Sequence, residues 1–135
     1  MSSTLVDTNI FVDLLREDPK WLAWSSSAIE KCAEEGSLAI NPIIYAELSI
    51  MFPSVEALDE ALQPIKIQRH DLPWDAAFLA GKAYLKYRQS GGAKQSPLPD
   101  FYIGAHAAVR GMNLLTRDKK RYGTYFPKLK IISPV

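Results

Sequence analysis

A chain of 135 residues is expected to form one domain with a substantial core, and its apolar (47%) and charged (23%) fractions are typical of a globular protein. The single cysteine, Cys32, excludes an intramolecular disulfide. We also see no signal-peptide pattern and no apolar run near the ~20 residues of a membrane helix, so a cytoplasmic location is expected. Residues 1–60 hold three basic and eleven acidic groups whereas residues 61–135 hold thirteen and four, which suggests a polyanionic partner unless folding mixes the charges.

The first half of the chain alternates between short apolar runs and amphipathic stretches. The apolar run before Asp7 stops at that carboxylate, and helical spacing follows it. Pro19 and Gly36 are expected to end the first two helices, and Asn41-Pro42 to begin the third. The predicted elements are a strand at 3–6, helices at 10–16 and 21–35, a strand at 38–40, helices at 42–52 and 53–62, and a strand at 65–67.

The second half contains a long predicted helix and the one loop-like stretch. Residues 89–99 are rich in glycine, serine and proline and predict a mobile loop that could be a lid or a substrate contact. The predicted elements are a helix at 73–88, this loop, a helix opened by Asp100, a strand at 113–116, a short basic turn and a last strand at 130–132. The residues of the 73–88 helix expected to face inward are Ala77, Phe78, Ala80, Gly81, Tyr84 and Leu85.

Strands that alternate with helices predict an α/β fold. We expect a single domain over residues 1–135, built as a three-layer sandwich with a central parallel sheet of four or five strands and helices on both faces. In such sheets ligands bind at the carboxyl ends of the strands, where a residue that directly follows a strand lies.

Two acids, Asp7 and Asp118, follow predicted strands and should share this edge of the sheet. Asp7 could instead be only a helix cap, a role that asparagine or serine fills as well. Asp118 stands among basic residues, so it could be a solvated turn acid. Each of the two therefore has a structural alternative to a metal-binding role.

Two further acids lie in helices. Glu47 falls within an apolar stripe between Ile44 and Met51, where a carboxylate needs a partner, although it could also reach solvent from the stripe's edge. Asp100 begins a helix, which capping alone would explain, but the small residues after it would bring this helix end close to the sheet.

The four acids together predict a metal centre. Converging carboxylates repel one another, and a hard cation such as Mg²⁺ or Mn²⁺ with oxygen ligands relieves the repulsion. Thr116, two residues before Asp118, could support a ligand by a hydrogen bond, and Thr8 and Asn9 would form the turn that orients Asp7.

Other titratable residues are interpreted as structural. His70 and His106 match no zinc spacing, and we expect neither to act in catalysis. Cys32 is expected to fill an apolar site, and Asp13 to lie on the polar face of the first helix.

Four short motifs resemble the PIN domain, and most closely the VapC-type ribonuclease toxins of prokaryotic toxin–antitoxin pairs. They occur in that family's order, and the spacing and length also fit, so the resemblance covers essentially the whole chain. The motifs are Leu5-Val6-Asp7-Thr8-Asn9-Ile10-Phe11, Tyr45-Ala46-Glu47-Leu48, Pro99-Asp100-Phe101-Tyr102-Ile103-Gly104-Ala105-His106-Ala107 and Leu115-Thr116-Arg117-Asp118-Lys119-Lys120-Arg121-Tyr122.

The resemblance implies a Mg²⁺- or Mn²⁺-dependent endoribonuclease that cleaves RNA with a metal-activated water, is inhibited by a cognate antitoxin and is usually dimeric. It assigns Asp7, Glu47, Asp100 and Asp118 to the family's acidic quartet, with Asp7 and Asp100 as the firmest metal ligands. The fourth position varies in the family, which leaves the role of Asp118 open. The RNA-binding candidates are Arg117, Lys119, Lys120 and Arg121.

Two alternatives remain open at this point. One is a catalytically silent PIN-like module that binds RNA or protein. The other is a receiver-like signalling domain with an acidic Mg²⁺ pocket, although the acidic pair expected after its first strand is missing, because Thr8 follows Asp7.

Overall fold

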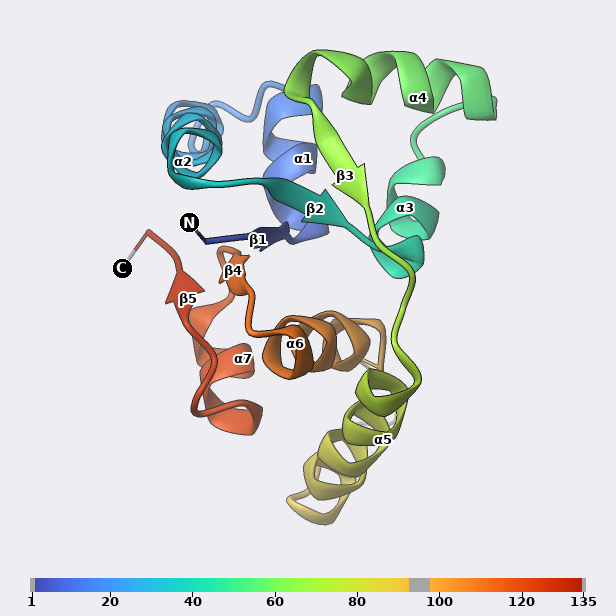
Figure 1. The fold of residues 1–135 in the computed structure, drawn as a ribbon, viewed down its shortest axis with the longest axis vertical. Helices are drawn as coiled ribbons and strands as arrows, with labels where there is room; N and C mark the ends of the chain where they lie inside the picture. Colours follow the sequence, from blue (N-terminus) through green and yellow to red (C-terminus); the bar gives the residue numbers. More distant parts are fainter. Residues whose placement is uncertain (1, 93–97, 135) are drawn as a thin grey trace.

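The computed structural model describes residues 2–92 and 98–134, and it contains a five-stranded parallel sheet (Figure 1). The order across the sheet is β3-β2-β1-β4-β5, and every neighbouring pair is parallel. The strands are β1 (Thr4–Val6), β2 (Leu38–Ile40), β3 (Ile67–Arg69), β4 (Asn113–Leu115) and β5 (Ile131–Ile132). The predicted α/β fold with a parallel sheet is confirmed.

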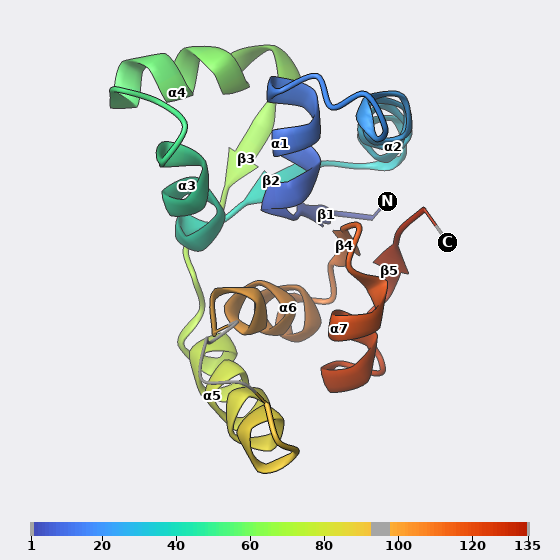
Figure 2. The ribbon, with the colours of Figure 1, turned by 180° about the vertical axis from the view of Figure 1, so that it is seen from behind.

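Helices cover both faces of the sheet. In Figures 1 and 2, α1, α2 and α4 lie on one side, and α6 and α7 lie on the other with α5 packed outside α6. The helices are α1 (Thr8–Leu15), α2 (Leu22–Glu35), α3 (Pro42–Ser49), α4 (Val55–Leu62), α5 (Trp74–Gln89), α6 (Leu98–Arg110) and α7 (Lys119–Tyr125). Within residues 2–92 and 98–134, no helix combines the length and hydropathy that a membrane span requires.

The central strand β1 determines where a site can form. It pairs with β2 on one side and β4 on the other, so the strand order reverses beside it. Such a reversal opens a crevice at the carboxyl ends of the strands. A receiver domain has the strand order 2-1-3-4-5 instead, and the receiver-like alternative is therefore wrong.

Several helices begin where a side chain satisfies a free backbone N–H. The Asn41 amide oxygen accepts from Ile44 N at 3.0 Å, as its position before Pro42 predicted, and Ser54 Oγ accepts from Ala57 N at 3.1 Å. Gly36 ends α2 as predicted, but its backbone is extended rather than left-handed. A Cβ there would lie 1.7 Å from the Ser2 carbonyl oxygen, so close packing is what requires glycine.

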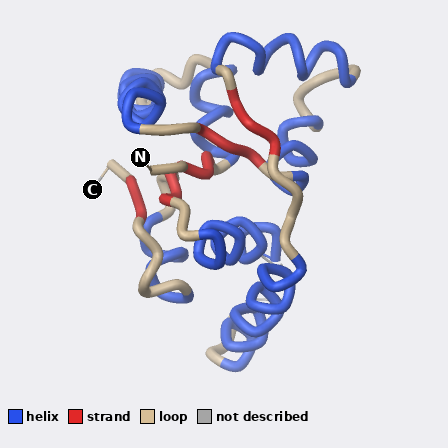
Figure 3. Tube along the Cα trace, in the orientation of Figure 1, coloured by secondary structure: helices blue, strands red, loops and turns tan. Residues whose placement is uncertain are grey.

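Several predicted elements differ from the structure by up to three residues at their ends, and three predictions differ in ways that have a structural cause. The strand predicted at 65–67 lies at Ile67–Arg69, because a 3-10 turn at Gln63–Ile65 and the left-handed Lys66 precede it. The basic stretch predicted as a turn forms the helix α7, as the tube in Figure 3 also shows. The predicted loop at 89–99 is shorter, since Gln89 ends α5 and α6 begins at Leu98; residues 93–97 lie outside the described residues.

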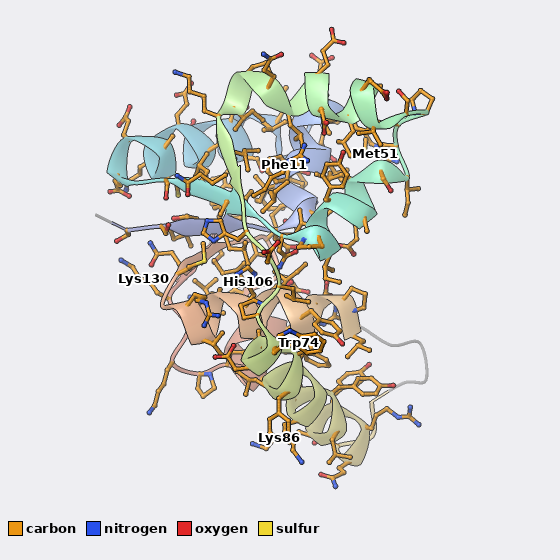
Figure 4. All side chains as sticks on the ribbon, turned by 45° about the vertical axis from the view of Figure 1, so that its right-hand side comes forward. Phe11, Met51, Trp74, Lys86, His106 and Lys130 are labelled. Carbon is orange, nitrogen blue, oxygen red and sulfur yellow. The ribbon has the colours of Figure 1, made fainter. Side chains whose placement is uncertain are left out.

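The predicted inward face of α5 is wrong at its largest residues. Phe78 and Leu85 are 69% and 49% exposed, whereas the buried residues are Ala76, Ala80 and Ala83. The reason is that α5 packs on α6 and not on the sheet, so only a narrow stripe of alanines is covered. Figure 4 shows Trp74 at the start of this helix, and its side chain is 92% exposed.

A buried hydrogen bond joins α3 to α6, the helices that carry Glu47 and Asp100. Because the Asn41 amide oxygen already caps α3, its Nδ2 donates to His106 Nδ1 at 3.0 Å. In Figure 4, His106 lies on the side of the sheet opposite Phe11. Burial, with smaller effects from His70 and Arg110, lowers the pKa of His106 to about 4.

We predict that His106 makes folding stability depend on pH. The His106 imidazole takes up a proton near pH 6.5 in the unfolded chain and only near pH 4 in the folded chain. The contribution of neutral His106 to folding stability is therefore fully present above pH 6.5 and is lost as the pH falls toward 4. Relative to His106→Gln, the wild type should lose about 1–2 kcal/mol between pH 7.5 and 4.5 in urea denaturation. A difference that does not change with pH would show that His106 is not held neutral.

Candidate active site

Four acids from two helices and two strand ends line one cavity. Asp7 follows β1, Glu47 lies in α3, Asp100 in the first turn of α6, and Asp118 between β4 and α7. The cavity has a volume of about 290 Å³ and is also lined by Thr8, Asn9, Val12 and Arg117. The structure thus brings all four predicted acids to the carboxyl edge of the sheet.

A larger hollow of about 680 Å³ lies between α4 and β3, away from these acids. Its main charged groups, Asp59 and Arg69, form an ion pair with each other, and Tyr45 also donates to Asp59. The smaller cavity is therefore the better candidate for chemistry, because its acids are only partly compensated.

Asp7 is the most buried member of the set, with 4% of its surface exposed. Its Oδ1 accepts from Thr8 N at 2.7 Å, in the manner of a helix cap. Its Oδ2 accepts from Thr116 Oγ1 at 2.7 Å, Asn9 Nδ2 at 3.2 Å and the Tyr122 hydroxyl at 3.3 Å. These four donors hold the carboxylate in one orientation, and none of the four carries a positive charge.

The charge of Asp7 is nevertheless costly. Its pKa is raised to about 7, by burial first and also by the nearby charges of Asp100 and Glu47, although the hydrogen bonds from Thr116 and Thr8 lower it. The charged form of Asp7 is therefore disfavoured at this buried position, and a nearby cation would stabilise it.

The supporting residues connect the strand ends to one another. Thr116 Oγ1 donates to Asp7 and accepts from Asp118 N at 3.0 Å, so one hydroxyl links the two acids. The Asn9 side chain contacts both Asp7 and Thr116, and its Oδ1 accepts from Arg117 N at 3.3 Å. These contacts fix the ends of β1 and β4 relative to each other.

Glu47 is positioned by a residue on a different helix. The Thr8 hydroxyl donates to Glu47 Oε1 at 2.5 Å. Burial first, and then the charge of Asp100, raise the pKa of Glu47, while the bond from Thr8 lowers it. Glu47 therefore belongs to the same electrostatic cluster as Asp7.

Arg121 holds the remaining two acids. Its guanidinium donates to Asp100 Oδ2 and lies 3.7 Å from Asp118 Oδ2. Burial raises the pKa of Asp100, Arg121 lowers it, and Asp118 raises it. Asp118 also caps α7 by accepting from Arg121 N at 3.4 Å.

The donor set fits a hard divalent cation in its chemistry but not yet in its arrangement. All four candidates are carboxylates, the ligand type that Mg²⁺ and Mn²⁺ prefer. In the described part of the chain, however, no three His, Cys, Asp or Glu side chains stand close enough together to hold one ion. Glu47 is hydrogen-bonded to Thr8, and Asp100 and Asp118 are turned toward Arg121.

One acid assigned to the solvated face, Asp13, is buried, and that prediction is wrong. It is 1% exposed and forms a two-pronged ion pair with Arg117, at 2.9 Å from Nε and 3.1 Å from Nη2. Ser25 Oγ of α2 also donates to it at 2.6 Å. The periodicity of α1 could not reveal this, because Asp13 is buried by residues outside α1, namely Ser25 of α2 and Arg117.

The four RNA-binding candidates differ in their surroundings. Arg117 is engaged with Asp13 and lies over the Trp21 ring, and Arg121 is engaged with Asp100. Lys119 and Lys120 are exposed at the start of α7. The two lysines are thus the candidates whose charges face solvent.

Sequence reasoning missed Tyr122, which is 1% exposed and donates to Asp7. The spacing of Tyr122 and Phe126, four residues apart, was the available signal for α7. A Cβ on Gly104 would meet the Phe126 ring at 2.6 Å and the Tyr122 ring at 2.9 Å. Gly104 of α6 therefore lets α7 approach until Tyr122 reaches Asp7.

The two histidines and the cysteine lie outside the cavity. His70 follows β3, and His106 makes the structural hydrogen bond described above. Cys32 is buried in α2 among apolar residues.

Comparisons with known proteins identify a family and a fold. A family model described as "PIN domain" matches residues 4–127. A chain of VapBC2 from Rickettsia felis, bound to a DNA fragment from its promoter, is 21% identical, with a TM-score of 0.74 and 97% and 98% of the two chains covered. A chain of VapBC-1 from nontypeable Haemophilus influenzae is 20% identical, with a TM-score of 0.71 and 97% of both chains covered. No curated protein matches.

The buried ion pair predicts a structural role for Arg117. Among the described residues, Arg117→Ala would leave the buried Asp13 carboxylate with the Ser25 hydroxyl as its remaining side-chain partner, and we expect it to lower the free energy of unfolding by about 2–4 kcal/mol. Lys119→Ala, which removes an exposed charge, should change it by less than about 0.5 kcal/mol. Equal stabilities of the two variants in urea denaturation would contradict this role.

Proposed function

This chain belongs to the PIN domain family, and on that premise we propose that it is a Mg²⁺- or Mn²⁺-dependent endoribonuclease, the toxin of a toxin–antitoxin pair. The observation that carries the proposal is the convergence of four carboxylates on one cavity, with Asp7 buried at its base. A buried acid whose pKa is raised to about 7 beside other acids is a structural cost that a bound cation would remove.

Asp7 and Asp100 would be the main ligands of the ion, and Glu47 and Asp118 would complete its surroundings. When bound, a divalent ion lowers the pKa of a water molecule and offsets the negative charge that develops on the phosphate. The hydrogen bonds from Thr116 and Asn9 hold the Asp7 carboxylate in place before the ion arrives.

Glu47 is the acid best suited to take a proton from the attacking water. Its raised pKa brings it closer to neutral pH than an exposed glutamate, which favours general-base chemistry. The Thr8 hydroxyl restrains Glu47 Oε1, so the side chain would be oriented before substrate binds.

The substrate and partners follow from charge and from the structural neighbours. Lys119 and Lys120 lie beside Asp118 on an exposed helix start, where they would attract an RNA backbone. The related chains from Rickettsia felis and Haemophilus influenzae belong to VapBC assemblies, which supports a cognate antitoxin as the partner here, and a homodimer is also expected.

One observation favours the alternative of a catalytically silent PIN-like module. In the described residues no three acids are arranged to hold an ion, since Arg121 engages two of them. RNA cleavage distinguishes the two functions, because a nuclease would cleave RNA and a silent module would bind it without cleaving it.

We predict that the purified chain cleaves RNA in the presence of Mg²⁺ or Mn²⁺ and that excess chelator abolishes the cleavage. Asp7→Asn and Asp100→Asn should each lower the rate by about 10²-fold or more, because each removes a ligand charge. Asp71→Asn, which changes an exposed aspartate that does not line the cavity, should cleave like the wild type.

Rates measured on total RNA and on a single-stranded oligonucleotide decide between the two functions. Equal cleavage by the wild type, Asp7→Asn and Asp100→Asn would refute the assigned site. RNA binding without cleavage in any metal would favour the silent module.

A further inference from the structure

Arg121 supplies a positive charge inside the acid cluster. Its Nη1 donates to Asp100 Oδ2 and lies 3.7 Å from Asp118 Oδ2, so one guanidinium nitrogen serves two of the four acids. The Arg121 side chain is 38% exposed, and those of Asp100 and Asp118 are 26% and 40% exposed. The contact is therefore at the mouth of the cavity and not deep in the core.

The position of Arg121 is fixed by the short helix that carries it. Asp118 caps that helix through Arg121 N, and the next residue, Tyr122, is buried against Asp7. The backbone of Arg121 is therefore held by the cap at Asp118 on one side and by the buried Tyr122 on the other. Its contact with the acids follows from the fold, whereas a long side chain on a free loop could adopt many positions.

The other arginine at the cavity cannot serve the same purpose. Arg117 lines the cavity, but its guanidinium forms the two-pronged pair with the buried Asp13. Among the contacts that the structure gives for the four cavity acids, those of Arg121 are the ones that bring an arginine side chain to them.

We propose that Arg121 is a built-in counter-ion that a divalent cation must displace from Asp100 and Asp118. The inference rests on the proposed function in one respect, since it concerns the same metal site. An Asp100 oxygen that accepts a guanidinium N–H cannot at once present the same lone pair to a metal. Competition from Arg121 would therefore raise the metal concentration that is needed to fill the site.

Displacement of Arg121 by a cation would also explain why the four acids line one cavity although, among the described residues, no three of them are placed to hold one ion. With Arg121 in place, part of the negative charge of the cluster is compensated, which lowers the cost of folding the chain before a metal binds. Once a cation takes over that compensation, the carboxylates of Asp100 and Asp118 are released to turn toward it.

The test is calorimetric titration of Mn²⁺ into the metal-free full chain at pH 7.5 and fixed ionic strength. Arg121→Gln removes the competing cation and should bind Mn²⁺ about three- to ten-fold more tightly than the wild type, as expected for loss of a partly exposed ion pair. Arg121→Lys keeps the charge but not the planar fork, and its affinity should fall between the two.

Lys120→Gln is the matched control, because it removes the same charge from the neighbouring, exposed position of α7. It should bind Mn²⁺ within about two-fold of the wild type, since it tests only the long-range effect of net charge. If Arg121→Gln does not fold, the comparison of Arg121→Lys with the wild type decides the question.

Three outcomes would overturn the inference. They are an unchanged or weaker Mn²⁺ affinity of the Arg121 variants, an equal gain in Lys120→Gln, and no Mn²⁺ binding by any form. The proposed function is judged separately by RNA cleavage. If Arg121→Gln binds Mn²⁺ more tightly but the wild type cleaves no RNA, the counter-ion role is supported and the nuclease is refuted. If the wild type cleaves RNA with metal but Arg121→Gln binds Mn²⁺ no more tightly, the nuclease is supported and the counter-ion role is refuted.

Discussion

The burial of one carboxylate, that of Asp7, is the constraint on which the rest of the site depends. The side chain lies at the end of the central strand, where the strand order reverses, and 4% of its surface is exposed. Four hydrogen bonds orient it but do not neutralise it, and its pKa is raised to about 7. Capping of α1 does not account for this charge, because asparagine would cap the helix without it.

The other elements hold further acids near this one by contacts that are wholly or partly buried. The hydrogen bond between Asn41 and His106 joins α3 to α6, and so relates Glu47 to Asp100. The pair of Arg117 with Asp13 joins the end of β4 to α1. Gly104 admits the rings of Tyr122 and Phe126, which brings α7 beside Asp7. The cavity is thus bounded by helices whose relative positions are each set by a specific polar or steric contact.

Much of this arrangement could be predicted from the sequence, and the exceptions have physical causes. Asp7, Asn41 and Asp118 follow apolar runs, and parallel strands bring such positions to one edge. Asp13 could not be assigned, because its burial depends on contacts with Ser25 of α2 and with Arg117, which periodicity within one helix does not show. Phe78 was placed inward because it is apolar, although α5 has no sheet to cover it. The contact of Arg121 with Asp100 depends on α7, a helix that was predicted as a turn because its sequence is rich in basic residues.

The central claim is that a divalent cation compensates the charge of Asp7 in this cluster. The most direct measurement is the melting temperature of the wild type and of Asp7→Asn at pH 8, each in chelator and in excess Mn²⁺. The account predicts that Mn²⁺ raises the melting temperature of the wild type, because the ion binds only the folded chain, and has a much smaller effect on Asp7→Asn. An equal rise in both proteins, or no rise in the wild type, would contradict it.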